Sequence, residues 1–151
     1  MKDWFFPIKR VEQGDWNGCG IASVAAICSV TYWRARAEFF PLRRQFRDDP
    51  TLHVAQDHMV RVIERLGFSA EIVSNASFKR RAAPAITCFS WVPDIPGNAF
   101  GIHAIVWDPF KKVFIDPGPD NFRNLPARKY LELIRKSNFN TIVITGKKDS
   151  K

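Results

Sequence analysis

The chain has 151 residues, of which 46% are hydrophobic and 25% are charged. This composition is typical of one globular domain and argues against a disordered chain. The net charge is +8, but the basic residues form only short, scattered clusters. That pattern indicates a solvated basic surface or an acidic partner, and it argues against a nucleic-acid-binding motif.

The first half of the chain predicts helices. Residues 19–32 carry small and apolar side chains almost all round, which is typical of a buried central helix. A second helix is expected within 34–46, where Pro41 makes one unbroken helix unfavourable. A third helix is expected from Thr51, which would cap it, to Leu66.

The second half predicts mainly strands. Alternation points Phe68, Ala70 and Ile72 inward from the first of them. The expected strands are 68–73, 84–92, 100–107, 112–116 and 140–145, with a helix at 126–136. Helices followed by a mostly antiparallel sheet define an α+β fold. We expect a single domain over 1–146 and a charged, disordered tail at 147–151.

Cys19 is the leading candidate for a functional residue. It opens the predicted central helix, where the positive end of the helix dipole favours a thiolate over a thiol. Gly18 and Gly20 flank it and allow a substrate or another backbone segment to approach closely. Gln13 lies six residues upstream and can offer its amide N–H to an oxyanion. Cys28, by contrast, is expected to be a small core residue.

A predicted hairpin brings a histidine opposite an aspartate. A tight loop at 108–111 would pair Trp107 with Lys112, Ile105 with Phe114, and His103 with Asp116. Directly opposed side chains have Cβ atoms about 4.5–5.5 Å apart, which lets an imidazole and a carboxylate form a hydrogen bond. A loop with an odd number of residues would instead shift the register by one, unless a bulge restored it.

These residues supply the groups that Cys–His hydrolysis needs. Cys19 would be the nucleophile, His103 would stabilise the thiolate and protonate the leaving group, and Asp116 would fix the ring tautomer. Gln13 and the backbone N–H of Cys19 would form an oxyanion hole. Each residue alone also has a structural explanation, such as core packing, so their joint order and spacing carry the argument. We expect no metal site and no cofactor, because ligand spacing and phosphate-loop motifs are lacking.

The segment Gln-Gly-Asp-Trp-Asn-Gly-Cys-Gly-Ile-Ala-Ser at 13–23 resembles the nucleophile motif of papain-like cysteine peptidases. Within that clan it is most similar to the bacteriocin leader-processing peptidases and their stand-alone relatives. The segment 101–106 resembles the Gly-x-His-x-x-Val segment that carries the base in this family, and 116–118 resembles its Asp-Pro-Gly. The resemblance implies a papain-like fold, with a central N-terminal helix packed on a mostly antiparallel sheet. It also implies the same roles for Gln13, Cys19, His103 and Asp116.

We therefore expect a cysteine hydrolase that cleaves a peptide or isopeptide bond through a thioester on Cys19. Trp16, Gly18, Gly101 and Trp91 are expected to border the substrate. The same groups could serve a glutamine deamidase or a transglutaminase-like effector. A catalytically inactive papain-like domain that binds a peptide is a further alternative. The partner is expected to be a peptide or protein, and the net charge favours an acidic one.

No nucleic-acid or membrane partner is expected. No apolar stretch approaches the roughly 18 residues of a membrane span, and the N-terminal apolar patch is too short for a signal-peptide core. The three cysteines, Cys19, Cys28 and Cys88, lack the spacing of a disulfide framework. These features predict a cytoplasmic protein and leave export by a specialised secretion system open. They do not define an oligomeric state.

Overall fold

A computed structural model describes residues 7–14, 18–42, 54–75, 83–90, 102–118, 125–137 and 139–148. Within these residues the chain forms four α-helices and a five-stranded sheet, which confirms the α+β class. The helices are α1 (Cys19–Cys28), α2 (Tyr32–Phe39), α3 (Gln56–Arg65) and α4 (Ala127–Lys136), with a short 3-10 helix, η1 (Phe40–Leu42), after α2. The strands are β1 (Phe68–Ser74), β2 (Ala85–Ser90), β3 (Ile102–Asp108), β4 (Val113–Ile115) and β5 (Asn140–Lys147).

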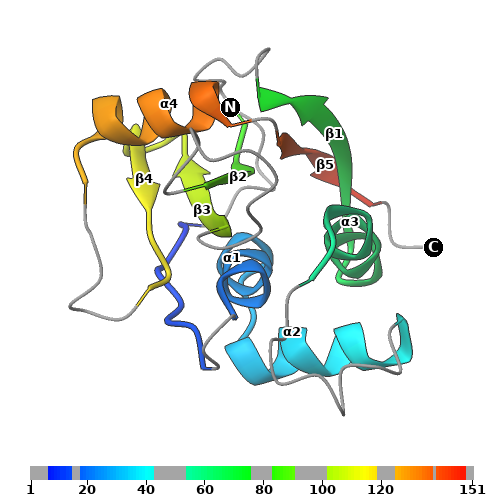
Figure 1. Ribbon diagram of the computed structural model, residues 1–151. Helices are drawn as coiled ribbons and strands as arrows, with labels where there is room; N and C mark the ends of the chain where they lie inside the picture. Colours follow the sequence, from blue (N-terminus) through cyan, green and yellow to red (C-terminus); the bar gives the residue numbers. More distant parts are fainter. Residues whose placement is uncertain are drawn as a thin grey trace.

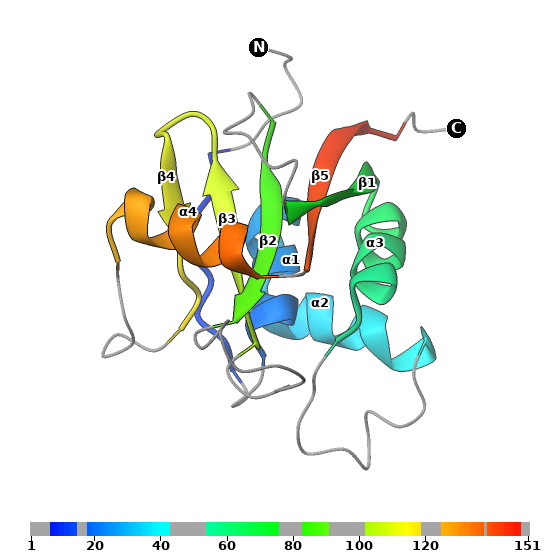
Figure 2. The same ribbon diagram turned by 45° about the horizontal axis from the view of Figure 1, so that its top comes forward.

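The sheet separates two layers of helices. Its strand order is β1-β5-β2-β3-β4, and every neighbouring pair is antiparallel. Helices α1 and α3 pack on one face, while α4 packs on the other (Figure 1). Figure 2 shows the sheet between α4 in front and α1 behind. The chain therefore has two cores, one on each face.

Strand alternation decides which residues enter which core. In β2 and β3, Ile86, Cys88, Ala104 and Val106 join the core under α1. Ala85, Phe89, Ile105 and Trp107, which alternate with them, join the core under α4. Both faces of these two central strands are thus covered, which explains why 84–92 and 100–107 are apolar on consecutive positions.

Helix α1 is buried along its whole length, as its sequence predicts, but it is shorter than expected. It ends at Cys28, because Ser29 adopts a left-handed conformation with φ of 57° and closes the helix. Thr31 then caps the start of α2, and its side-chain oxygen accepts a hydrogen bond from the backbone N–H of Arg34. The predicted helix over 19–32 is therefore two elements joined by a sharp turn.

Two glycines allow the close packing of α1. A Cβ atom on Gly20 would collide with Cγ2 of Val54 and lie 3.4 Å from Sδ of Met59, so α3 and the segment that leads into it approach the start of α1 through this gap. A Cβ on Gly18 would overlap the hydroxyl of Tyr32. The glycines beside Cys19 therefore have a packing role on the inner side of the helix.

Other elements begin or end at different residues than predicted. The second helix becomes 3-10 at Phe40–Leu42, around Pro41, and α3 begins at Gln56 with Ala55 as its cap. The predicted cap Thr51 lies outside the described residues. The inward orientation predicted for Ile72 is wrong, because this side chain lies on the edge strand β1 and is 43% exposed.

The C-terminal strand is longer than expected. Lys147 pairs with Phe68 as the last residue of β5, and the backbone N–H of Lys148 donates to the carbonyl oxygen of Gly67 over 2.8 Å. The boundary expected at 146 is therefore wrong for these two residues, because backbone pairing continues through them. Residues 149–151 lie outside the described part of the chain.

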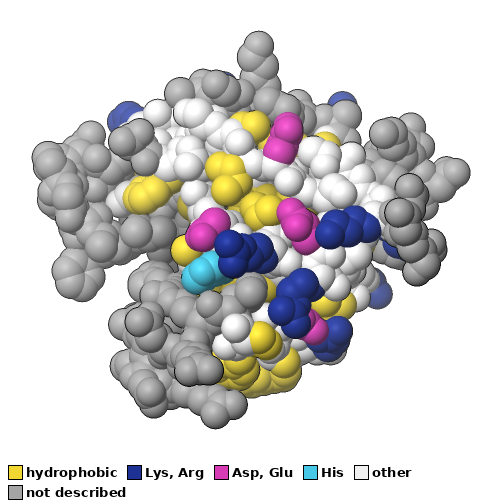
Figure 3. Space-filling model, turned by 90° about the vertical axis from the view of Figure 1, so that its right-hand side faces the viewer, with side chains coloured by type: hydrophobic (Ala, Val, Ile, Leu, Met, Phe, Trp, Pro, Cys, Tyr) yellow, Lys and Arg dark blue, Asp and Glu magenta, His cyan; other side chains and the backbone are white. Residues whose placement is uncertain are grey.

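Basic and acidic side chains lie next to one another on the face that carries α3 (Figure 3). Arg65 pairs with Glu38 over 2.9 Å, and Lys148 pairs with Glu64 over 3.8 Å. Such exposed pairs contribute little to stability. None of the described helices has the length and apolar character needed to span a membrane.

Candidate active site

The β3–β4 hairpin has a different register from the predicted one. Trp107 pairs with Phe114 and Val106 with Ile115, so Trp107 does not face Lys112 and Ile105 does not face Phe114. The turn is the cause. Oδ1 of Asp108 accepts hydrogen bonds from the backbone N–H groups of Phe110 (2.8 Å) and Lys111 (3.2 Å), and Lys112 adopts a left-handed φ of 56°. These contacts hold residues 109–112 in the loop and move β4 two residues along.

His103 and Asp116 nevertheless touch. Nε2 of His103 lies 2.7 Å from Oδ1 of Asp116. In the observed register the two residues are diagonal neighbours on one face and are not directly opposed, with Asp116 just beyond the last residue of β4. Diagonal positions stay within reach of long side chains, so the predicted contact forms although the predicted pairing is wrong.

Three donors hold the Asp116 carboxylate. Oδ1 accepts from the backbone N–H of Gly118 over 2.9 Å as well as facing His103, and Oδ2 accepts from the hydroxyl of Tyr130 over 2.8 Å. Burial alone would raise the pKa of Asp116, but the hydrogen bond and charge of His103, with the bonds from Gly118 and Tyr130, lower it below its ordinary value. Asp116 is therefore a carboxylate at neutral pH.

Cys19 lies against the same histidine. It is the first residue of α1, which packs on β3, and its side chain is one of the groups that raise the pKa of His103. Burial would lower the pKa of His103, but its hydrogen bonds to Asp116 and Cys19 outweigh burial and raise the pKa to about 9. His103 is thus an imidazolium at neutral pH. Because Nε2 faces Asp116, Nδ1 is the ring nitrogen that can face the sulfur.

The candidate site joins side chains from the two sides of the sheet. Cys19 belongs to the core under α1, whereas Asp116 contacts Tyr130 of the core under α4. All three are nearly covered, with exposures of 8% for Cys19, 4% for His103 and 9% for Asp116. Charges in such a water-poor environment interact more strongly than they do at the surface.

The N-terminal segment 7–14 docks on the turn that follows Asp116. The backbone N–H of Gln13 donates to the carbonyl oxygen of Pro117 over 3.0 Å. Nε of Arg10 donates to the carbonyl oxygen of Asp116 over 2.7 Å, and the same guanidinium bonds the carbonyl oxygen of Gly118. Gln13 is therefore fixed to the turn that carries the carboxylate, although the two are far apart in sequence.

The other two cysteines differ from Cys19. All three are free and buried. Burial raises the pKa of Cys28 to about 12 and is the main reason that the pKa of Cys88 is also about 12. Both side chains are therefore thiols at neutral pH, and neither is expected to be a nucleophile.

The predicted substrate-binding residues are only partly described. Gly18 is buried against Tyr32, which gives it a packing role. Trp16, Gly101 and Trp91 lie outside the described residues. Sequence reasoning missed Tyr130 and Arg10. A tyrosine on the apolar side of an amphipathic helix was a usable signal for the first, because a buried tyrosine hydroxyl usually finds a hydrogen-bond partner. The backbone carbonyls that Arg10 binds leave no sequence signal.

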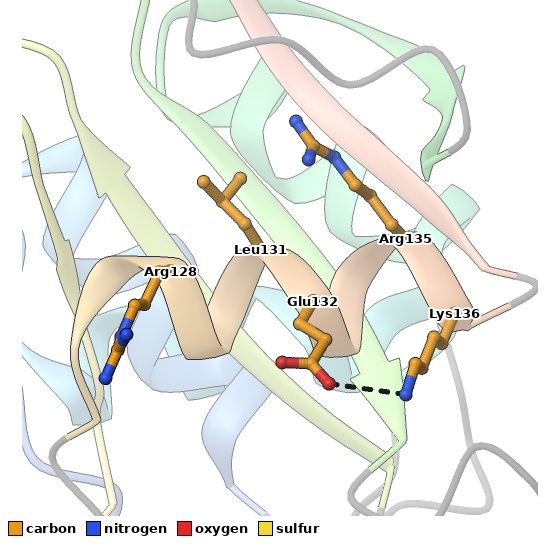
Figure 4. Close-up of a pocket in the computed structure, with 5 residues that line it drawn as sticks. All are labelled: Arg128, Leu131, Glu132, Arg135 and Lys136. Atoms are coloured by element: carbon orange, nitrogen blue, oxygen red, sulfur yellow. Dashed lines mark hydrogen bonds and ion pairs between the residues drawn. The ribbon is translucent and has the colours of Figure 1, made fainter.

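A shallow depression of about 420 Å³ lies elsewhere, on the outer side of α4. Its lining residues are Arg128, Leu131, Glu132, Arg135 and Lys136, and Figure 4 shows the bond between Glu132 and Lys136. Most of its lining residues lie on the side of α4 that points away from Tyr130, so the depression is separate from Cys19, His103 and Asp116. Among the described residues, no cluster of three or more His, Cys, Asp or Glu side chains could hold a metal ion.

A scan against protein-family models finds no match for this chain, and a search of curated proteins finds none either. The function is therefore inferred from the geometry of Cys19, His103 and Asp116.

Proposed function

We propose that the protein is a cysteine hydrolase of papain-like architecture that cleaves a peptide or isopeptide bond. One observation carries the proposal: Nε2 of a buried histidine is bonded to a buried carboxylate, and a cysteine at a helix start acts on the same imidazole. A nucleophile, a proton donor and an orienting group in contact are the arrangement that acyl transfer by a thiol needs. The central helix packed on an antiparallel sheet supports the papain-like assignment.

In the proposed reaction, the Cys19 thiolate attacks the carbonyl carbon of the substrate amide. The C–N bond breaks as the His103 imidazolium gives its proton to the leaving amine, and a thioester remains on Cys19. The neutral His103 then takes a proton from water, and the resulting hydroxide attacks the thioester carbonyl. The C–S bond breaks, a carboxylic acid leaves, and the thiolate and imidazolium are restored. Asp116 stays ionised and fixes the ring throughout.

The negative oxygen of each tetrahedral intermediate needs donors. The backbone N–H of Cys19 at the start of α1 and the side-chain amide of Gln13 are the candidates. The hydrogen bond from the Gln13 backbone to Pro117 supports this role, because it fixes Gln13 beside the carboxylate turn.

Selective alkylation tests the proposal. Iodoacetamide at pH 7, followed by peptide mapping, should label Cys19 far faster than Cys28 or Cys88, which burial keeps as thiols. His103→Ala should remove this selectivity. Cys19→Ala should abolish hydrolysis of a peptide library, while Cys28→Ala serves as the matched control that retains it. Equal labelling of all three cysteines, or hydrolysis by Cys19→Ala, would rule the mechanism out.

A further inference from the structure

Tyr130 stands behind the Asp116 carboxylate. It is fully buried on the inner side of α4. Its hydroxyl donates to Oδ2 of Asp116 over 2.8 Å and accepts a hydrogen bond from the backbone N–H of Leu125 over 3.3 Å. These two bonds fix the direction of the hydroxyl proton and use its oxygen as an acceptor.

The tyrosine ring has no room to swing away. It packs at an angle against Phe89, with ring centres 6.0 Å apart, and against Phe114, with ring centres 5.7 Å apart. Phe89 also packs edge-on against the His103 ring at 5.8 Å. One aromatic cluster therefore holds the tyrosine and borders the histidine.

The rotation of the Asp116 carboxylate, by contrast, has to be fixed by hydrogen bonds. The torsion that rotates a carboxylate about its last bond is broad, so packing alone defines it poorly. The N–H of Gly118 and His103 both act on Oδ1, and Tyr130 is the donor described at Oδ2. Fixing both oxygens defines the plane of the group.

We propose that Tyr130 is a positioning residue of this site, whose hydroxyl holds the Asp116 carboxylate in the rotation that presents Oδ1 to His103. The inference rests on the proposed function, which gives the His103–Asp116 pair its importance. It extends the hydrogen-bonded chain from His103 through Asp116 to α4. A merely structural tyrosine would satisfy its hydroxyl without affecting the ring of His103.

The test measures His103 directly. The titratable or charged groups described around the pair are Cys19 on α1, Tyr130 on α4 and Arg10 in the N-terminal segment. In protein carrying ¹⁵N-labelled histidine, the imidazole shifts give the titration midpoint of His103. Tyr130→Phe keeps the ring and removes the hydroxyl. The carboxylate can then rotate, the imidazolium loses part of its fixed bond, and the midpoint should fall by roughly half a pH unit or more.

Thr141→Val is the matched control. Thr141 is also fully buried, and its hydroxyl donates to a side-chain oxygen, Oδ1 of Asn75, over 2.6 Å. Its loss should lower stability to a similar degree and leave the His103 midpoint unchanged. The midpoint separates positioning from stability. An unchanged or raised midpoint in Tyr130→Phe, or an equal fall in Thr141→Val, would overturn the inference.

The same samples keep the two proposals apart. Treatment with iodoacetamide at pH 7 reports whether Cys19 is selectively reactive. If Cys19 is unselective but the midpoint falls in Tyr130→Phe, the hydrolase proposal fails and the positioning of the pair by Tyr130 holds. If both hold, alkylation of Cys19 in Tyr130→Phe should be roughly tenfold slower than in the wild type, which corresponds to about 1.4 kcal/mol.

Discussion

The two faces of the sheet are packed with different kinds of residue, and the candidate site includes residues from both sides. On one face, α1 itself carries small residues such as Gly20, Ala22 and Ala25, which let neighbouring elements approach its backbone closely. The face under α4 is lined by large aromatic residues, among them Phe89, Trp107 and Tyr130. The position of Cys19 therefore depends on tight backbone packing. The position of the His103–Asp116 pair depends on hydrogen bonds that single atoms can change.

This difference predicts opposite responses to substitution. Changes on the α1 face should damage the fold before the chemistry. Changes at the polar groups of the α4 face should damage the chemistry before the fold.

Among these variants, Asp116→Asn should lose the most activity relative to its loss of stability. The amide keeps the size of the side chain but loses the charge that stabilises the imidazolium. We expect hydrolysis to fall by roughly 10²–10⁴-fold, by analogy with the orienting carboxylate of other triads. Burial lowers the pKa of His103, so without Asp116 this pKa should fall from about 9 and the alkaline limb of activity should move to lower pH. The pH profile of hydrolysis checks this.

Stability adds a second readout for the same variant. The folded-state pKa of His103 lies above its ordinary value of 6.5, so the stability gained by its protonation is present below pH 6.5 and lost as the pH rises through about 9. Urea unfolding at several pH values should show this loss in the wild type and a smaller one in Asp116→Asn. An identical pH dependence in both proteins would contradict the assignment of the shift to Asp116.

Gly20→Ala tests the α1 face. Replacing glycine by alanine inside a helix normally adds roughly 0.5–1 kcal/mol of stability. Here the new Cβ would collide with Val54, so we expect a loss of roughly 1–3 kcal/mol, measured by urea unfolding. Adding Val54→Ala should restore part of the loss, because it removes the colliding methyl group. If Gly20→Ala were more stable than the wild type, the packing around Gly20 would have room for the added methyl group.

Arg10→Ala tests the segment that joins the two halves of the site. Arg10 is exposed but binds the carbonyl oxygens of Asp116 and Gly118. Losing these bonds should cost about 1 kcal/mol or less in unfolding free energy and slow hydrolysis by about tenfold or less. Lys9→Ala is the matched control, since it removes an equal charge from the neighbouring exposed residue. If both variants slow hydrolysis equally, net charge and not the docking of Arg10 is responsible.

Local sequence patterns predicted most of the helices and strands. The features that these patterns did not predict depend on particular backbone conformations and contacts. The burial of α1, the start of α4 near Pro126 and the strand alternation all follow from short-range chemistry. The end of α1 at Cys28 does not, because Ser29 is a serine in a left-handed conformation, which sequence rarely indicates.

The site shows the same division. Cys19, His103 and Asp116 were recognisable from their residue types and order, and the structure brings them into contact. The hairpin register was not recognisable, because the side chain of Asp108 and the left-handed Lys112 shift the four-residue turn from 108–111 to 109–112. The contact of Tyr130 with Asp116 was not recognisable, because Tyr130 lies on a helix and no strand register connects it with Asp116.

The place of β5 has a consequence for how the molecule assembles. Strand β5, the last of the described strands, lies between β1 and β2, and its residues Ile142 and Ile144 complete the core that holds α1. During synthesis, β2, β3 and β4 can pair as they emerge from the ribosome, but β1 pairs, among the described strands, with β5 alone and must wait for residue 140 and its successors. The core around Cys19 therefore closes only after β5 has been made.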